Sequence, residues 1–126
     1  MSDKTHHISV SSRVAFIPDQ SDIGKSRYVF AYTITITNLG SVAAQLLSRH
    51  WIITDADNQV QEVKGDGVVG EQPVIRPNES FEYTSGTAIA TPVGTMRGNY
   101  RMLAEDGVEF DASIPEFTLA MPRILH

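Results

Sequence analysis

The feature that most constrains this chain is an alternation of two kinds of residue with a period of two. Between Arg27 and Asn38, tyrosine, phenylalanine and isoleucine alternate with valine, alanine and threonine, and a similar alternation runs from His7 to Phe16. Successive side chains of a strand point to opposite faces, whereas a helix repeats every 3.6 residues. The alternation therefore predicts strands with one buried face.

Turn signals recur roughly every ten residues and predict eight or nine short strands. Asp55–Asn58 and Glu105–Gly107 are typical of hairpin turns, and residues 18–24 are expected to form a loop. Pro115 predicts that residues 114–119 form a separate edge segment. We expect an all-β, antiparallel two-sheet sandwich that is immunoglobulin-like or fibronectin type III-like.

The only tryptophan, Trp51, lies in a segment, residues 42–54, whose middle is apolar on both faces. Such a strand needs cover on both sides, so it is expected either at the centre of its sheet or beneath a loop. We therefore predict that Trp51 fills the core between the two sheets.

Composition narrows the function classes. The 126 residues are expected to form one domain, 1–126, with a core at about 6–120 and a short C-terminal tail. The absence of cysteine excludes disulfide and thiolate chemistry and favours a cytoplasmic location. No apolar run is long enough for a membrane helix, so no membrane association is expected. A net charge of −5 disfavours nucleic acid as the main ligand.

A glycine motif, Gly65-x-Gly67-x-x-Gly70, matches the dinucleotide fingerprint, but the residues after it do not begin a helix, as that fold requires. Two interpretations remain. The backbone amides of the loop could form an anion-binding nest, with charge supplied by Lys64, Arg76 or the pair Arg97 and Arg101. The favoured alternative is that the glycines only supply positive φ in a loop that crosses between the sheets.

Arg49 interrupts an apolar strand. The favoured interpretation is a structural arginine that pairs with an acid or stacks on an aromatic ring. The alternative is a guanidinium that faces a ligand. The candidate ligand-binding residues are accordingly Gly65, Gly67, Gly70, Lys64, Arg49 and Arg76.

No catalytic or metal-binding constellation is evident. The histidines lack partners at ligand spacing, and Asp55–Asn58 lacks the glycine and terminal glutamate of a calcium loop. The serines lack a recognisable base and orienting group. We therefore expect no enzymatic activity, no metal site and no cofactor.

Several segments closely resemble the ApaG family, and the match covers essentially the whole chain. They are Tyr28–Ile36, Leu47–Asp55, Gly65–Pro73, Tyr83–Gly86, the spacing Gly94-x-Met96-x-Gly98-x-Tyr100, and Ile114-Pro115-x-Phe117-x-Leu119. The chain departs from the family at Asn78, where glycine is more common, but asparagine also tolerates a left-handed turn.

This resemblance implies a fibronectin III/immunoglobulin-like sandwich in a bacterial cytoplasmic protein associated with cobalt and magnesium efflux or resistance. In the family the gene often neighbours a dinucleoside-polyphosphate hydrolase. Similar domains in F-box proteins and in a polymerase-interacting protein look like protein-binding modules. The family's glycine motif is suspected of binding pyrophosphate, which would fall on Gly65, Gly67 and Gly70 here.

We therefore expect a non-enzymatic module that binds a protein partner through an exposed sheet edge or loop face. The alternative is a binder of a nucleotide polyphosphate, pyrophosphate or phosphate at Gly65–Gly70. Any effect on cobalt or magnesium is expected to be indirect. Edge strands also leave open a sheet-extending homodimer.

Overall fold

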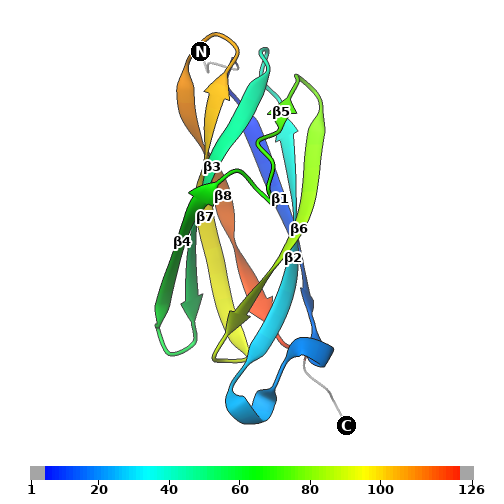
Figure 1. Ribbon diagram of the computed structural model, residues 1–126, viewed down its shortest axis with the longest axis vertical. Coiled ribbons are helices and arrows are strands. Elements are labelled where there is room, and N and C mark those ends of the chain that lie inside the picture. The colour runs from blue at the N-terminus through cyan, green and yellow to red at the C-terminus, as the bar shows by residue number, and fades with distance from the viewer. Residues whose placement is uncertain (1–4, 123–126) are drawn as a thin grey trace.

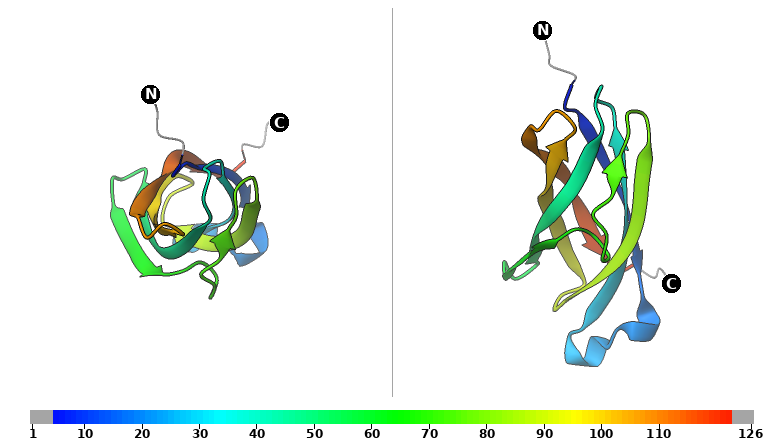
Figure 2. Two further views of the ribbon diagram at one scale, coloured as in Figure 1. Left: turned by 90° about the horizontal axis from the view of Figure 1, so that it is seen from above. Right: turned by 45° about the horizontal axis from the view of Figure 1, so that its top comes forward.

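Two antiparallel sheets packed face to face make up the fold of the computed structural model, which describes residues 5–122 (Figure 1, Figure 2). The three-stranded sheet has the order β1 (Ile8–Phe16), β2 (Tyr28–Asn38), β6 (Ser80–Ile89). The five-stranded sheet has the order β4 (Val60–Asp66), β3 (Ala44–Asp55), β7 (Val93–Ala104), β8 (Glu109–Ala120), and the short β5 (Val74–Ile75) also pairs with β3. The predicted all-β, two-sheet sandwich is confirmed.

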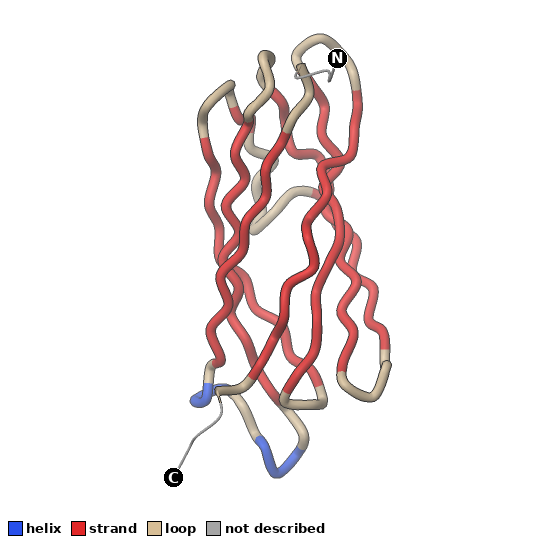
Figure 3. The backbone as a smooth tube through the Cα atoms, turned by 180° about the vertical axis from the view of Figure 1, so that it is seen from behind, coloured by secondary structure: helices blue, strands red, loops and turns tan. Residues whose placement is uncertain are grey.

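The connections are mostly turns, as expected (Figure 3). The loop predicted at residues 18–24 contains two single 3-10 turns, η1 (Pro18–Gln20) and η2 (Ile23–Lys25). In the hairpin after β3, the Asp55 carboxylate accepts the backbone amides of Asp57 and Gln59. Asn78 adopts a φ of 68°, so it does occupy the left-handed conformation expected of it.

Residues 114–119 do lie on an edge strand, as predicted, but Pro115 does not interrupt it, because β8 continues through the proline. A register shift accommodates the proline. Met96 and Gly98 of β7 face Phe117 and Ile114, which leaves two residues of β8 opposite one residue of β7. A bulge leaves its extra residue outside the ladder, where the missing N–H of proline costs no hydrogen bond.

Trp51 lies at the centre of the core and is 2% exposed, as predicted. Its ring meets Tyr32 of the three-stranded sheet at a centroid distance of 5.3 Å. From its own sheet, Tyr100 and Phe117 approach it edge-on at 6.3 and 5.9 Å. Its strand, β3, is central, with β4 and β7 as neighbours. The indole therefore joins both sheets through contacts between aromatic rings.

The two long sides of the sandwich differ. On one side β1 packs against β8. On the other, which we call the open side, the outer edges of β4 and β6 pair with no strand in the described part of the chain. The segment 67–73, which follows β4, crosses this side toward β5 (Figure 1, green). The two free edges and the crossing segment therefore lie on the same side of the sandwich.

Truncating the indole should destabilise the fold strongly. We expect Trp51→Ala to lower the free energy of unfolding by about 3–5 kcal/mol, because it removes a large buried ring and leaves a cavity. Urea unfolding measures the change, with Val74→Ala as the control because Val74 is 60% exposed. A loss below about 1 kcal/mol for Trp51→Ala would contradict the packing described here.

Candidate functional site

The glycine motif is only partly a loop. Because β4 runs to Asp66, Gly65 is a strand residue, and it pairs in register with Arg49 of β3. The loop predicted to begin at Gly65 therefore begins two residues later. Gly67 and Gly70 have φ values of +61° and +80°, so these two do supply the positive φ expected of them.

Gly65 makes room for Arg49. A Cβ atom at Gly65 would lie 2.8 Å from the Arg49 guanidinium, which real Cβ contacts essentially never show. In the space left free, Arg49 Nη1 donates to the backbone carbonyls of Asp66 and Gly67, at 3.0 Å each. Arg49 thus bonds to backbone carbonyls at the end of β4 and the start of the crossing segment, rather than to an acidic side chain.

A tight turn carries the second half of the motif. The amides and carbonyls of Val68 and Glu71 bond to each other at 2.8 and 2.9 Å. The two residues between them, Val69 and Gly70, have φ values of +44° and +80°, the pattern of a type I′ turn. Positive φ is strained for a β-branched residue such as Val69. Strain of this kind concentrates at ligand-binding sites and switch regions.

The amides of this segment are only partly available. The Gly67 amide donates to the carbonyl of Leu47, and the Val68 amide to that of Glu71. Within residues 5–122, no acceptor is bonded to the amides of Val69 and Gly70. An anion at this turn would therefore meet two backbone donors, fewer than an extended nest provides.

A pocket of about 290 Å³ lies beside the turn, between the two sheets. We call it the upper pocket; it is lined by Tyr32, Arg49, Asp66, Val68, Val69, Gly70, Tyr83 and Ser85. The hydroxyl of Tyr83 is hydrogen-bonded to that of buried Tyr100 at 2.5 Å. Burial raises the pKa of both phenols well above the ordinary tyrosine value, so both are neutral at physiological pH.

The other candidate cations lie away from the upper pocket. Lys64 points from the outer face of β4 and forms an ion pair with Glu62 at 3.7 Å. Arg76 lines a different pocket, beside Ala44 and Leu103. Arg101 pairs with Asp111 at 3.2 Å. Of the predicted residues, the structure brings Arg49 together with Gly65, Gly67 and Gly70. Lys64 shares a different, shallow pocket with Arg49 and Gly65, and Arg76 lies apart from all of them.

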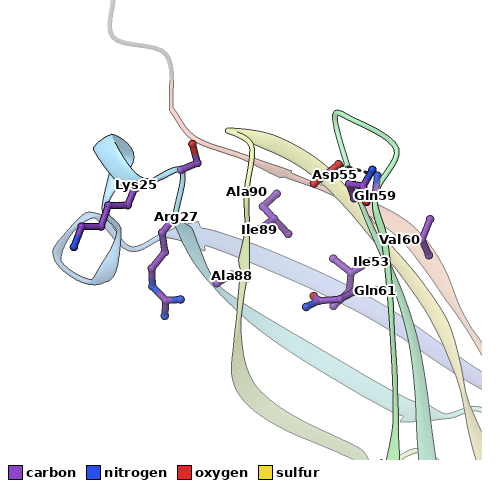
Figure 4. A pocket seen from close by; sticks show the side chains of 11 residues that line it. Lys25, Arg27, Ile53, Asp55, Gln59, Val60, Gln61, Ala88, Ile89 and Ala90 are labelled. Carbon is purple, nitrogen blue, oxygen red and sulfur yellow. Dashed lines mark hydrogen bonds between the residues drawn. The ribbon is translucent and has the colours of Figure 1, made fainter.

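A larger pocket, of about 480 Å³, was missed by the sequence analysis (Figure 4). We call it the lower cleft. Its apolar wall includes Ile53 of β3 and Ile89 of β6, Val60 of β4 lies at its rim, and two cations, Lys25 and Arg27, come from the segment before β2. Neither cation forms an ion pair with any described residue. The only sequence feature that could have indicated this pocket is the close spacing of Lys25 and Arg27. No local sequence pattern connects these two residues with β3 or β4.

On the outer face of the five-stranded sheet, His50 Nε2 lies 2.6 Å from Glu62 Oε1. The histidine and Lys64 together lower the pKa of the Glu62 carboxyl. Among residues 5–122, no three histidine or acidic side chains are placed to hold a metal ion. In the same range, no helix has the length and apolar character required to cross a membrane.

Comparison with known proteins gives consistent matches. A family model described as the ApaG domain matches residues 18–104. A relative named Protein ApaG from Thiobacillus denitrificans is 68% identical over 98% of this chain and 97% of its own length. Another, from Dechloromonas aromatica, is 61% identical over the full length of both chains. A crystal structure of a protein named ApaA from Bordetella pertussis superposes with a TM-score of 0.93 at 54% identity, covering 98% of this chain and 100% of the other.

The buried tyrosine pair should make stability depend on alkaline pH. An unfolded tyrosine ionises near pH 10, whereas the raised pKa values keep Tyr83 and Tyr100 protonated in the folded state. Above about pH 10 the unfolded state therefore binds fewer protons, and the free energy of unfolding should fall as the pH rises.

Urea unfolding between pH 8 and 11 tests this, with the double variant Tyr83→Phe/Tyr100→Phe as the comparison, which should show a shallower fall. Absorbance at 295 nm reports phenolate directly. Ionisation of all four tyrosines near pH 10, while the protein stays folded, would contradict the burial of this pair.

Proposed function

The chain belongs to the ApaG family, and on that premise we propose that it is a non-catalytic binding module that recognises a protein partner through the open side of the sandwich. One observation carries the proposal. The unpaired edges of β4 and β6 lie on the same side as the lower cleft, whose two cations have no counter-ion among the described residues. Free sheet edges bind extended segments of other proteins through main-chain hydrogen bonds.

The polar groups of the interior support a structural rather than a catalytic assignment. Arg49 Nη1 is occupied by two carbonyls, and the neutral hydroxyls of Tyr83 and Tyr100 bond to each other. None of these groups is paired with a nucleophile, as acyl or phosphoryl transfer would require. In this proposal, the family's association with cobalt and magnesium efflux is an indirect effect exerted through the bound partner.

Site-specific cross-linking in the cell tests the proposal. A photoreactive benzoylphenylalanine replaces Gln61 of β4 or Ala90 after β6, both exposed at the lower cleft. We expect the same protein to be cross-linked from both positions. The control position is Ser11, exposed on β1. Equal yields of that product from Ser11, or no product at either cleft position, would contradict a partner on the open side.

A phosphate-bearing ligand in the upper pocket is the second candidate. The observation that favours it is the strained backbone of Val69, which lines the same pocket as Arg49. The amides of Val69 and of the next residue, Gly70, bond to no acceptor among the described residues. A nucleotide polyphosphate or pyrophosphate would meet a cation and hydrogen-bond donors there.

Calorimetric titration with pyrophosphate, ATP and diadenosine tetraphosphate decides this second candidate. Binding heat should be present for the unmodified protein and lost for Arg49→Gln, which removes the positive charge from the upper pocket. Arg101→Gln is the matched control, because Arg101 pairs with Asp111 on an exposed surface. The absence of heat with all three compounds would remove the candidate.

A further inference from the structure

Strand β6 is the least protected edge of the sandwich. Of the four edge strands, β1 and β8 pack against each other, and β4 carries Glu62 and Lys64. β6 has one charged residue, Glu82 near its start, and from Tyr83 to Ile89 it contains neither a charged residue nor a proline. Natural proteins usually block such edges with charges, prolines or bulges, because an unblocked edge pairs with any available strand. An edge left without these devices is free to bind.

This edge ends at the lower cleft. Ala88 and Ile89, the last residues of β6, line it, and Ile53 of the other sheet points toward Ile89, with Val60 farther out (Figure 4). Ile53 and Ile89 are 5% and 8% exposed and belong to the core, whereas Val60 is 64% exposed. An apolar side chain placed in the cleft would contact the core directly through Ile53 and Ile89.

The charges at the cleft select an acidic ligand. Figure 4 shows Lys25 and Arg27 on one side of the β6 end, with Asp55 on the other. The Asp55 carboxylate already accepts two amides of its own hairpin, whereas the two cations have no partner among the described residues. In a chain of net charge −5, two unpaired cations beside an apolar cleft form a local site for a carboxylate.

We propose that the free edge of β6 binds an extended segment of a partner protein as an added strand, with an apolar side chain in the lower cleft and acidic side chains at Lys25 and Arg27. This inference rests on the proposed function and specifies its site and the chemistry of the partner. Because side chains alternate along a strand, the bound segment is one in which apolar residues alternate with polar ones and acidic residues follow at one end.

Selection of peptides on the full chain tests the proposal. A random 12-residue library displayed on phage is panned against the protein, and the enriched sequences are synthesised with a fluorescent label. We expect apolar residues in alternation and acidic residues at one end. Enrichment of lysine- and arginine-rich peptides, or no enrichment, would overturn the inference.

Charge reversal locates the acidic end of the peptide. Lys25→Glu/Arg27→Glu should weaken binding of the labelled peptide about tenfold in fluorescence polarisation. The matched control is Lys64→Glu/Arg101→Glu, which changes the net charge equally but alters cations of β4 and β7, outside the lower cleft. Equal loss of affinity in both double variants would show that the peptide responds only to the net charge of the protein. That result would overturn the proposed site.

A lysine on the inner face of the edge tests strand addition. Thr87 faces Phe30 in register, and Phe30 is fully buried, so Thr87 is on the inner face of β6. Thr87→Lys should abolish binding, because an inward charge at an edge blocks pairing. Thr33→Lys, on the central strand β2, is the control and should change affinity less than about twofold.

The outcomes separate this inference from the proposed function. Peptides that bind the Thr87→Lys protein unchanged would place recognition elsewhere and overturn the β6 site, while a partner cross-linked at the lower cleft would still support a binding module. If sedimentation shows a dimer that Thr87→Lys dissociates, a second copy of the chain occupies the edge, and the inference is wrong. In hydrogen exchange, the bound peptide should slow the amides of Thr84–Ile89.

Discussion

The packing of Trp51 between the sheets is the interaction on which the other features depend. Its contacts with Tyr32, Tyr100 and Phe117 join both sheets, and a close-packed interior allows the strands little freedom around them. Because alternate residues of a strand share a face, burying Trp51 also turns Arg49 and Ile53 inward. The same face of β3 thus provides the arginine of the upper pocket, the core tryptophan and an apolar wall of the lower cleft.

Because the two long sides of the sandwich differ, part of the inner face of β3 is accessible from outside. On the side where β1 packs against β8, the sheets protect each other's edges. On the open side, the segment after β4 crosses the gap, and Arg49 bonds to the carbonyls of Asp66 and Gly67 where the segment begins. The upper pocket lies beside this crossing, and the lower cleft lies at the end of β6. The two proposals therefore concern separate sites on one side of the molecule. Arg49 lines the upper pocket and Arg27 lines the lower cleft, so each site can be altered independently.

Much of the fold could be predicted because its signals are local. Alternation identified the strands, an all-apolar middle identified β3 as central, and turn residues located the hairpin at Asp55. The errors arose where pairing overrides local preference. Pro115 was expected to end a strand, but a bulge against β7 accommodates it. Gly65 was expected in a loop, but it pairs with Arg49 within β4, where the absence of a side chain leaves room for the Arg49 guanidinium.

By itself, the sequence determined that the chain alternates buried and exposed faces, that its one indole belongs in the core, and that no local motif assembles a reaction centre. These are consequences of backbone geometry within a few residues. Only the tertiary structure decided that β6 has a free edge, that Arg49 reaches the crossing segment, and that Lys25 and Arg27, which form no ion pair within residues 5–122, lie beside a cleft. Those properties depend on which distant strands become neighbours. The residues before and after a given position do not identify the strand with which it will pair.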